Sequence, residues 1–344
     1  MQKLLPKKDF NEFIESLIKK YELIAPVKKD KILTKFDRIK DPKEIYLESI
    51  TKVPAKKFFI PENETILEFI DKKTIENKEK TKKRIILGLR KCDLNALQVI
   101  DKLMFDEHYK EKRKSSILIG FFCDKPDEYC FCNSMELKDD GYDLFFYPEG
   151  INYYISIGSK KGEILVKHLE NAKKDIVIPN PKNGKVLVSK NIDRHYRNKI
   201  WESDADKCLS CSACTIYCPT CNCFDLKDKL NINLKDAKRL RSEMSCQLLA
   251  FTRVAGGKSF RASRLARFKH FVYHKIDYYK KKKGRYMCVG CGRCLRACPP
   301  KIDWVNTINL LEEEEQIKKD NNKKTIKRRI KLIYIKSKRV KQIE

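Results

Sequence analysis

The sequence lacks any long apolar run. None of its hydrophobic stretches approaches the 18 or more residues that a membrane-spanning helix requires, so we expect no transmembrane segment. Residues 1–9 carry lysines, but no apolar core and no small-residue cleavage site of a secretory signal follow them. Both absences predict a cytoplasmic protein.

Motifs for nucleotide binding and for hydrolysis are also missing. The sequence contains no G-x-G-x-x-G stretch and no Ser/His/Asp arrangement. Residues 257–259 resemble the end of a Walker A loop, but Thr252 stands where that loop needs its first glycine. His270 and His274 have helical metal-ligand spacing without a recognisable third ligand, which predicts a basic helix face instead. We therefore expect no flavin, nicotinamide or substrate site in this chain alone.

Acidic residues are scarce relative to basic ones. The 344 residues include 76 Lys and Arg against 47 Asp and Glu, a formal net charge of +29. Such an excess is common in nucleic-acid-binding proteins. Here the basic residues are dispersed and no nucleic-acid motif accompanies them, so we expect no nucleic-acid partner. The charge instead favours acidic protein partners, such as an acidic redox subunit or a ferredoxin.

Cysteine, by contrast, is abundant. The odd count of 15, the chain length and the missing export signal argue against a disulfide framework. Eight of the cysteines form two copies of C-x₂-C-x₂-C-x₃-C-P, the spacing with which bacterial-type ferredoxins hold [4Fe–4S] clusters. The two runs are Cys208, Cys211, Cys214 and Cys218 with Pro219, and Cys288, Cys291, Cys294 and Cys298 with Pro299.

The two runs predict crossed ligation of two [4Fe–4S] clusters, because the fourth cysteine of each run in two-cluster ferredoxins ligates the other cluster. The predicted ligands are Cys208, Cys211, Cys214 and Cys298 for cluster 1, and Cys288, Cys291, Cys294 and Cys218 for cluster 2. Crossed ligation joins two runs that start 80 positions apart, so the fold of this domain should depend on its metal. Two Cys₄ zinc sites are the alternative, although zinc sites usually pair two separate C-x₂-C units.

Seven cysteines lie outside these runs. We expect Cys221, Cys223 and Cys246 to pack beside the clusters or to support their ligands, as free cysteines are often simply buried. The alternative is that they ligate a further group. The others are Cys92, Cys123, Cys130 and Cys132. Two of these follow predicted strands at the sheet edge where sites collect in α/β proteins. The four either hold a third cluster or a zinc ion, or remain unligated thiols, because C-x₆-C-x-C is not a standard spacing.

Periodicity predicts an α+β protein. A helix over 10–21, a strand–helix–strand unit over 84–122 and a hairpin over 143–157 indicate an α/β domain with parallel pairing. We assign a turn and a short helix to 61–73. The insert 226–284 between the runs is mostly helical in character, as in α-helical ferredoxins. The predicted division is an N-terminal α/β domain at 1–198, an α-helical-ferredoxin-like dicluster domain at 199–305 and a charged tail at 306–344.

A specific order of motifs over residues 10–305 resembles the β subunit of cytosolic NiFe hydrogenase/sulfhydrogenase and the related iron–sulfur subunit of anaerobic sulfite reductase. The motifs are Gly88-Leu-Arg-Lys-Cys-Asp-Leu-Asn-Ala-Leu97, Cys123, Cys130-Phe-Cys132, Cys218-Pro-Thr-Cys-Asn-Cys-Phe224 and Cys288-Val-Gly-Cys-Gly-Arg-Cys294. Lys91 stands where the family commonly has proline, and the charged tail departs from the pattern.

The resemblance implies an iron–sulfur electron-transfer subunit with two [4Fe–4S] clusters. Such a protein passes electrons between a subunit that binds flavin and NAD(P) and the catalytic subunit of a hydrogenase or sulfite reductase, and we do not expect it to be catalytic alone. Two other functions stay open. One is a self-contained sulfur or polysulfide reductase that uses Cys92 or Cys123 as its thiol. The other is a basic Cys₄ zinc protein that binds nucleic acid.

Overall fold

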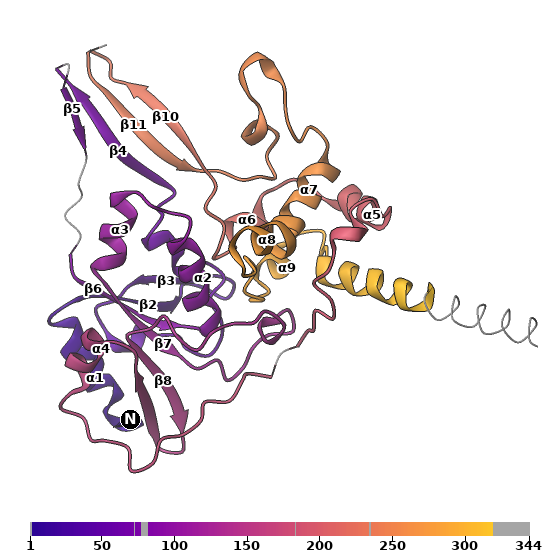
Figure 1. Ribbon diagram of the computed structural model, residues 1–344. Coiled ribbons are helices and arrows are strands. Elements are labelled where there is room, and N and C mark those ends of the chain that lie inside the picture. Colours follow the sequence, from indigo (N-terminus) through magenta and orange to yellow (C-terminus); the bar gives the residue numbers. More distant parts are fainter. Residues whose placement is uncertain (1, 72, 77–81, 183, 234, 319–344) are drawn as a thin grey trace, which may run out of the picture.

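The computed structural model describes residues 2–71, 73–76, 82–182, 184–233 and 235–318 (Figure 1). Within these ranges, none of the helices combines the length and the hydrophobicity that crossing a bilayer demands. Residues 319–344, most of the predicted tail, lie outside the described part of the chain.

A seven-stranded mixed sheet forms the larger part of the molecule, in the order β1-β9-β8-β7-β6-β2-β3. Its strands are β1 (Gln2–Pro6), β2 (Glu22–Lys28), β3 (Thr34–Arg38), β6 (Arg84–Leu89), β7 (Ser116–Phe121), β8 (Leu144–Glu149) and β9 (Asn152–Ile157). The four central strands β2, β6, β7 and β8 pair in parallel. Every residue of β6 and β7 is buried, as expected for parallel strands that are covered on both faces. The strands predicted within 84–122 and 143–157 and the parallel pairing are confirmed.

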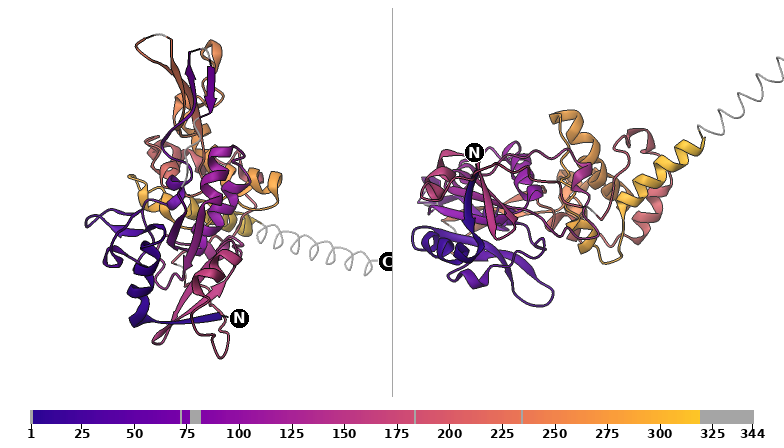
Figure 2. Two further views of the ribbon diagram at one scale, coloured as in Figure 1. Left: turned by 90° about the vertical axis from the view of Figure 1, so that its left-hand side faces the viewer. Right: turned by 90° about the horizontal axis from the view of Figure 1, so that it is seen from below.

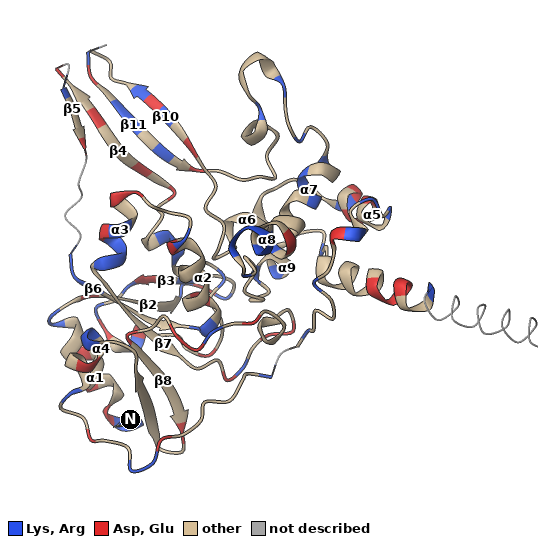
Figure 3. Ribbon diagram, viewed as in Figure 1, with Lys and Arg blue, Asp and Glu red and all other residues tan. Residues whose placement is uncertain are grey.

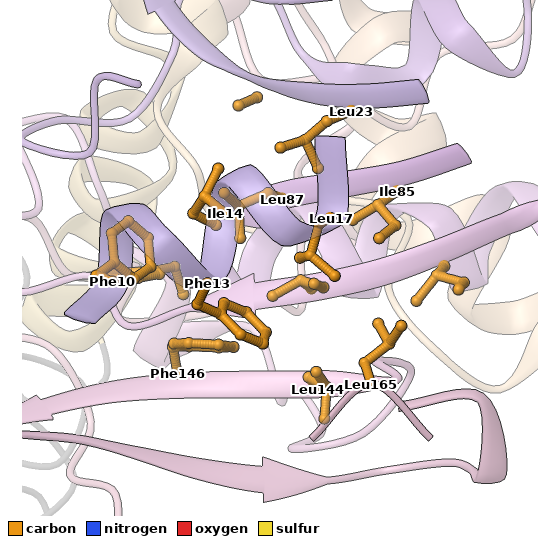
Figure 4. Close-up of a cluster of buried hydrophobic side chains, with 14 of the residues drawn as sticks. Phe10, Phe13, Ile14, Leu17, Leu23, Ile85, Leu87, Leu144, Phe146 and Leu165 are labelled. Carbon is orange, nitrogen blue, oxygen red and sulfur yellow. The ribbon is translucent and has the colours of Figure 1, made fainter. Parts of the chain in front are cut away.

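Helices cover both faces of this sheet. Their bounds are α1 (Phe10–Ile18), α2 (Lys91–Asp101), α3 (Glu107–Lys114) and α4 (Lys160–Val166). The helical spacing of Phe10, Phe13, Ile14 and Leu17 puts these side chains on one face of α1, where they pack with α4 against one side of the sheet (Figure 4). Helices α2 and α3 pack against the other side. The first turn of α2 therefore stands at the carboxyl ends of the parallel strands.

A second, smaller sheet projects from the rest of the molecule (Figures 1 and 2). Its antiparallel order is β10-β11-β4-β5. The strands are β4 (Asn63–Ile70), β5 (Lys73–Glu76), β10 (Phe224–Leu230) and β11 (Ala237–Glu243). The short helix expected within 61–73 is therefore wrong, as is the mostly helical character expected for 226–284. Strand β4 is stabilised by a partner far along the chain, and the sheet joins strands from both sides of the predicted boundary at 198 and 199.

The cysteine-rich part, residues 199–318, is otherwise helical. It contains α5 (Ile200–Lys207), α6 (Ala213–Ile216), α7 (Arg264–Tyr273), a π-helical turn (His274–Tyr278), α8 (Tyr279–Lys283), α9 (Arg293–Ala297) and a helix over 304–318. Trp201, Phe268 and Trp304 lie in its core. Ile308 and Leu311 are buried there too, so this core continues past residue 305. The predicted α+β class is confirmed.

Short 3₁₀ helices connect the larger elements. They are η1 (Lys7–Asp9), η2 (Pro42–Glu44), η3 (Ala55–Phe58), η4 (Cys132–Ser134), η5 (Asp193–His195), η6 (Leu249–Thr252) and η7 (Ala255–Gly257). Of these, η4 matters most for the site, because it begins at one of the cysteines outside the two runs.

Candidate metal centres

The two cysteine runs adopt the same local backbone shape. The residues two and four positions after the first cysteine have a left-handed φ in both runs: 52° and 69° at Ser210 and Ser212, and 64° and 69° at Gly290 and Gly292. In each loop the first of these residues donates its N–H to the leading cysteine, over 3.4 Å to Cys208 Sγ and 3.3 Å to Cys288 Sγ. Helices α6 and α9 then begin at equivalent positions. Amide donors to sulfur raise the reduction potential of a thiolate-ligated cluster.

The fourth cysteine of each run lies beside the other run. Burial is the main cause that raises the pKa of the Cys298 thiol, and the nearby thiols of Cys208 and Cys211 raise it further. The Cys294 pKa is raised by burial and then by Cys288 and Cys218. Like charges disfavour ionisation of a buried thiol, so these shifts report which sulfurs are neighbours. Cys298 therefore lies near the first run and Cys218 near the second, as crossed ligation would require. We call the first three cysteines of the first run with Cys298 the first group, and those of the second run with Cys218 the second group.

The spacing of the sulfurs bears on the kind of metal. Among the described residues, no three cysteine sulfurs lie within 4.8 Å of one another. Around a tetrahedral zinc ion with Zn–S bonds of about 2.3 Å, all sulfurs would be about 3.8 Å apart. The sulfurs are thus not arranged as a preformed single-ion site, and a donor set of four thiols fits an iron–sulfur cluster.

A partly open pocket adjoins the first group. It is lined by all four thiols predicted for cluster 1, by Cys294 of the second run, and by apolar side chains that include Phe268, Phe271, Ile302 and Trp304. Walls of this kind keep water away from a metal group and lower the local dielectric, which tunes its potential.

A buried cation stands beside the second group. Lys275 is 3% exposed, and its Nζ donates to Thr220 Oγ1 over 2.9 Å. The nearby thiols of Cys218, Cys221 and Cys288 raise the pKa of Lys275 against the opposing effect of burial, so it stays protonated. We did not predict this role from the sequence, because Lys275 lies in a strongly basic stretch that resembles a solvated surface.

The three cysteines that follow the first run hydrogen-bond to other thiols. The Cys221 thiol donates to Cys218 and lowers its pKa. The Cys246 thiol likewise donates to Cys223 and lowers the pKa of Cys223 to about 7. Cys221 and Cys246 are buried. These contacts favour the predicted supporting role over direct ligation.

The four remaining cysteines come together at one place, at the carboxyl edge of the large sheet and next to the second run. Burial is the main cause that raises the pKa of the Cys92 and Cys123 thiols. A nucleophilic thiol needs a lowered pKa instead. This environment disfavours the hypothesis of a self-contained reductase that attacks sulfur with Cys92 or Cys123.

His270 and His274 are partly buried and neighbour each other on one helical segment. Their rings stack with centroids 5.3 Å apart, and burial lowers their pKa values to about 4 and about 3. No metal-ligating set within the described residues includes them. Both imidazoles are therefore neutral at physiological pH, so these two residues do not contribute to a basic helix face.

We expect Gly290→Ala to destabilise the protein. A Cβ at Gly290 would lie 2.6 Å from Cys132 Cα, and its φ of 64° already disfavours a side chain. Backbone strain and a backbone clash together should cost about 2 kcal/mol or more. Thermal unfolding of the anaerobically purified protein checks this, with Gly284→Ala as a control. Gly284 has a φ of 74° but nothing within 4 Å of its Cβ position, so its loss should be smaller.

The fold and the paired cysteine loops define an iron–sulfur protein, and residues 207–302 match the family model of a 4Fe-4S dicluster domain. The chain is 31% identical over 327 residues to sulfhydrogenase 2 subunit beta of Pyrococcus furiosus, a match that covers 88% of this chain and 96% of the relative. The chain therefore belongs to the sulfhydrogenase β-subunit family. No solved structure matches it. The resemblance seen in the motifs is confirmed, as is the predicted role of an iron–sulfur electron-transfer subunit in a multisubunit oxidoreductase.

Proposed function

We propose that the chain holds two [4Fe–4S] clusters with crossed ligation and relays electrons between a partner that binds flavin and NAD(P) and a catalytic subunit. The catalytic partner is of the hydrogenase or the sulfite reductase type. The observation that carries the proposal is the exchange of fourth cysteines, with Cys298 beside the first run and Cys218 beside the second. Cytoplasmic conditions suit this role, because they keep thiolate ligands reduced.

The clusters supply one-electron redox chemistry when bound. The chain positions the clusters, surrounds them with apolar side chains and places charged groups beside them. The two left-handed loops direct amide N–H groups at Cys208 and Cys288, and apolar side chains line most of the pocket beside the first group. Protonated Lys275 offsets negative charge at the second group. These features act on the potentials of the clusters, as an electron relay requires.

Basic side chains offer a docking surface for an acidic partner. Lys281, Lys282 and Lys283 are exposed on α8, which follows the buried Lys275 in the chain (Figure 3). Electrostatic complementarity of this kind mainly raises association rates, and it weakens with salt. A redox subunit with an acidic face is thus the expected neighbour near the second group.

Anaerobic purification of the native complex tests the proposal. We expect a flavoprotein to co-purify, together with a subunit that contains nickel or sirohaem. NAD(P)H should bleach the iron–sulfur absorption of this chain only when the flavoprotein is present. Polysulfide reduction by the isolated chain would instead support the self-contained reductase. A colourless zinc-loaded chain that binds nucleic acid with a steep salt dependence would contradict the electron-transfer proposal.

A further inference from the structure

Four thiols outside the two runs converge from three segments of the chain. Cys92 lies in the first turn of α2, Cys123 follows the end of β7, and Cys130 and Cys132 flank Phe131 on the loop that leads to η4. The Cys132 sulfur is a close electrostatic neighbour of the other three thiols, and Cys123 is also a neighbour of Cys130. We name these four residues the edge quartet.

The edge quartet is fixed directly against the second cysteine loop. The Phe131 N–H donates to the Gly290 carbonyl over 2.8 Å. The Cβ positions of Gly290 and Gly292 would lie 2.6 Å from backbone atoms of Cys132 and Tyr129, so only glycine permits this approach. Cys130 Sγ also points at the Cys291 carbonyl, 3.7 Å away. The edge quartet and the second group are therefore adjacent and held by backbone contacts.

Two buried guanidinium groups face the edge quartet. Arg90 and Arg293 are 5% and 1% exposed. Arg293 Nη1 forms an ion pair with Asp93 Oδ1 over 2.7 Å. Arg90 instead donates to the backbone carbonyls of Leu47 and Phe122. The carboxylate of Asp93 is close enough to stabilise the charge of Arg90 but forms no side-chain ion pair with it.

One buried carboxylate thus faces two buried cations, and each uncompensated buried charge costs several kcal/mol. Four neutral thiols do not balance the second of these cations, whereas ligated thiolates would.

We propose that Cys92, Cys123, Cys130 and Cys132 bind a third iron–sulfur cluster. Thiolate ligation would place a net negative group against Arg90 and Arg293 and so complete the charge balance. Among the described residues no three sulfurs lie within 4.8 Å of one another, so the edge quartet does not present a preformed zinc site.

The edge quartet has a buried side and an outer side. Cys92 and Cys130 are 6% and 4% exposed, whereas Cys123 and Cys132 are half-buried. A cluster here would extend the path from the second group toward the surface of the α/β part. Transfer along it moves one electron, which oxidises one cluster by one unit and reduces the next by one, without bond or proton changes.

Metal analysis of the full-length chain, purified anaerobically and reconstituted with iron and sulfide, tests this proposal. We expect about twelve irons and twelve sulfides per chain if the third group is [4Fe–4S], or about ten of each if it is [2Fe–2S]. A value of about eight of each would overturn the proposal. This measurement uses the unaltered chain, so it does not depend on whether a variant folds.

A variant locates the additional iron. Cys123→Ala with Cys132→Ala removes the two outer thiols and should lose about four irons, or two for the smaller cluster, while the paramagnetic signals of the other two reduced clusters persist. Cys246→Ala, which removes a buried thiol elsewhere, should keep the full iron content. An unchanged iron content in the double variant, or loss of a zinc ion from it, would contradict a third cluster. Neither result would affect the proposal of two clusters in the paired runs.

Discussion

Combining Cys298→Ser with Cys211→Ser should cost the protein no more iron than either substitution alone. Under crossed ligation both residues belong to cluster 1, so the second substitution removes a ligand from a cluster that is already lost. Combining Cys298→Ser with Cys291→Ser should abolish both clusters, because Cys291 belongs to cluster 2. The predicted difference between the two double variants is about four irons and four sulfides per chain.

Iron and sulfide analysis of anaerobically purified single and double variants provides the measurement, and Cys246→Ser serves as a control for the loss of a buried thiol. Ligation within each run would give the opposite result. Cys298→Ser would then pair with Cys291→Ser as substitutions in the same cluster, and its combination with Cys211→Ser would remove both. Any iron bound by the edge quartet adds the same amount to every variant, so it does not affect the difference between the two double variants.

Lys275→Met should lower the reduction potential of the second cluster by an amount on the order of 100 mV. Reduction adds negative charge, which the buried ammonium group stabilises, so its removal favours the oxidised state. A charge a few ångströms away at an effective dielectric near 20 contributes about 2–4 kcal/mol, and a tenfold change in a one-electron equilibrium equals about 59 mV. Methionine retains much of the apolar volume of the lysine side chain.

Redox titration followed by paramagnetic resonance measures this shift, because the two clusters of one chain can be titrated together. The first cluster acts as an internal reference and should move much less. Lys282→Met removes the same charge from the exposed part of α8, where solvent screens it, and should change neither potential appreciably. Equal shifts of both clusters in Lys275→Met would contradict a local role for this lysine.

Local signals in the sequence were sufficient to predict the candidate ligands and the central strands of the large sheet. Each cysteine run contains its complete ligand spacing within eleven residues, and strands such as β6 and β7 are mostly apolar. The small sheet was missed because its stability comes from distant partners. Glu64 on β4 pairs with Arg241 on β11, which is 177 positions away, and the sequence near Glu64 gives no sign of that partner.

The charge-compensating residues were missed for a related reason. Lys275 and Arg293 look like ordinary members of a chain with 76 basic residues. Only the folded structure shows that they are buried beside thiols, and that Arg293 is paired with Asp93 from the other half of the chain. The sequence supplied the ligand candidates, whereas the groups that set their charge environment depend on tertiary packing.

The pairing of β11 with β4 has a consequence for the order of events during synthesis. Under crossed ligation, cluster 1 lacks its fourth ligand until Cys298 has left the ribosome, although its other three ligands emerge more than 80 residues earlier. Strands β10 and β11 emerge in the interval and can dock on β4, which has already been made. We infer that this docking holds the incomplete first run in place. The small sheet would then restrict the positions of the first three ligands and so limit incorrect metal ligation until the remaining cysteines have been translated.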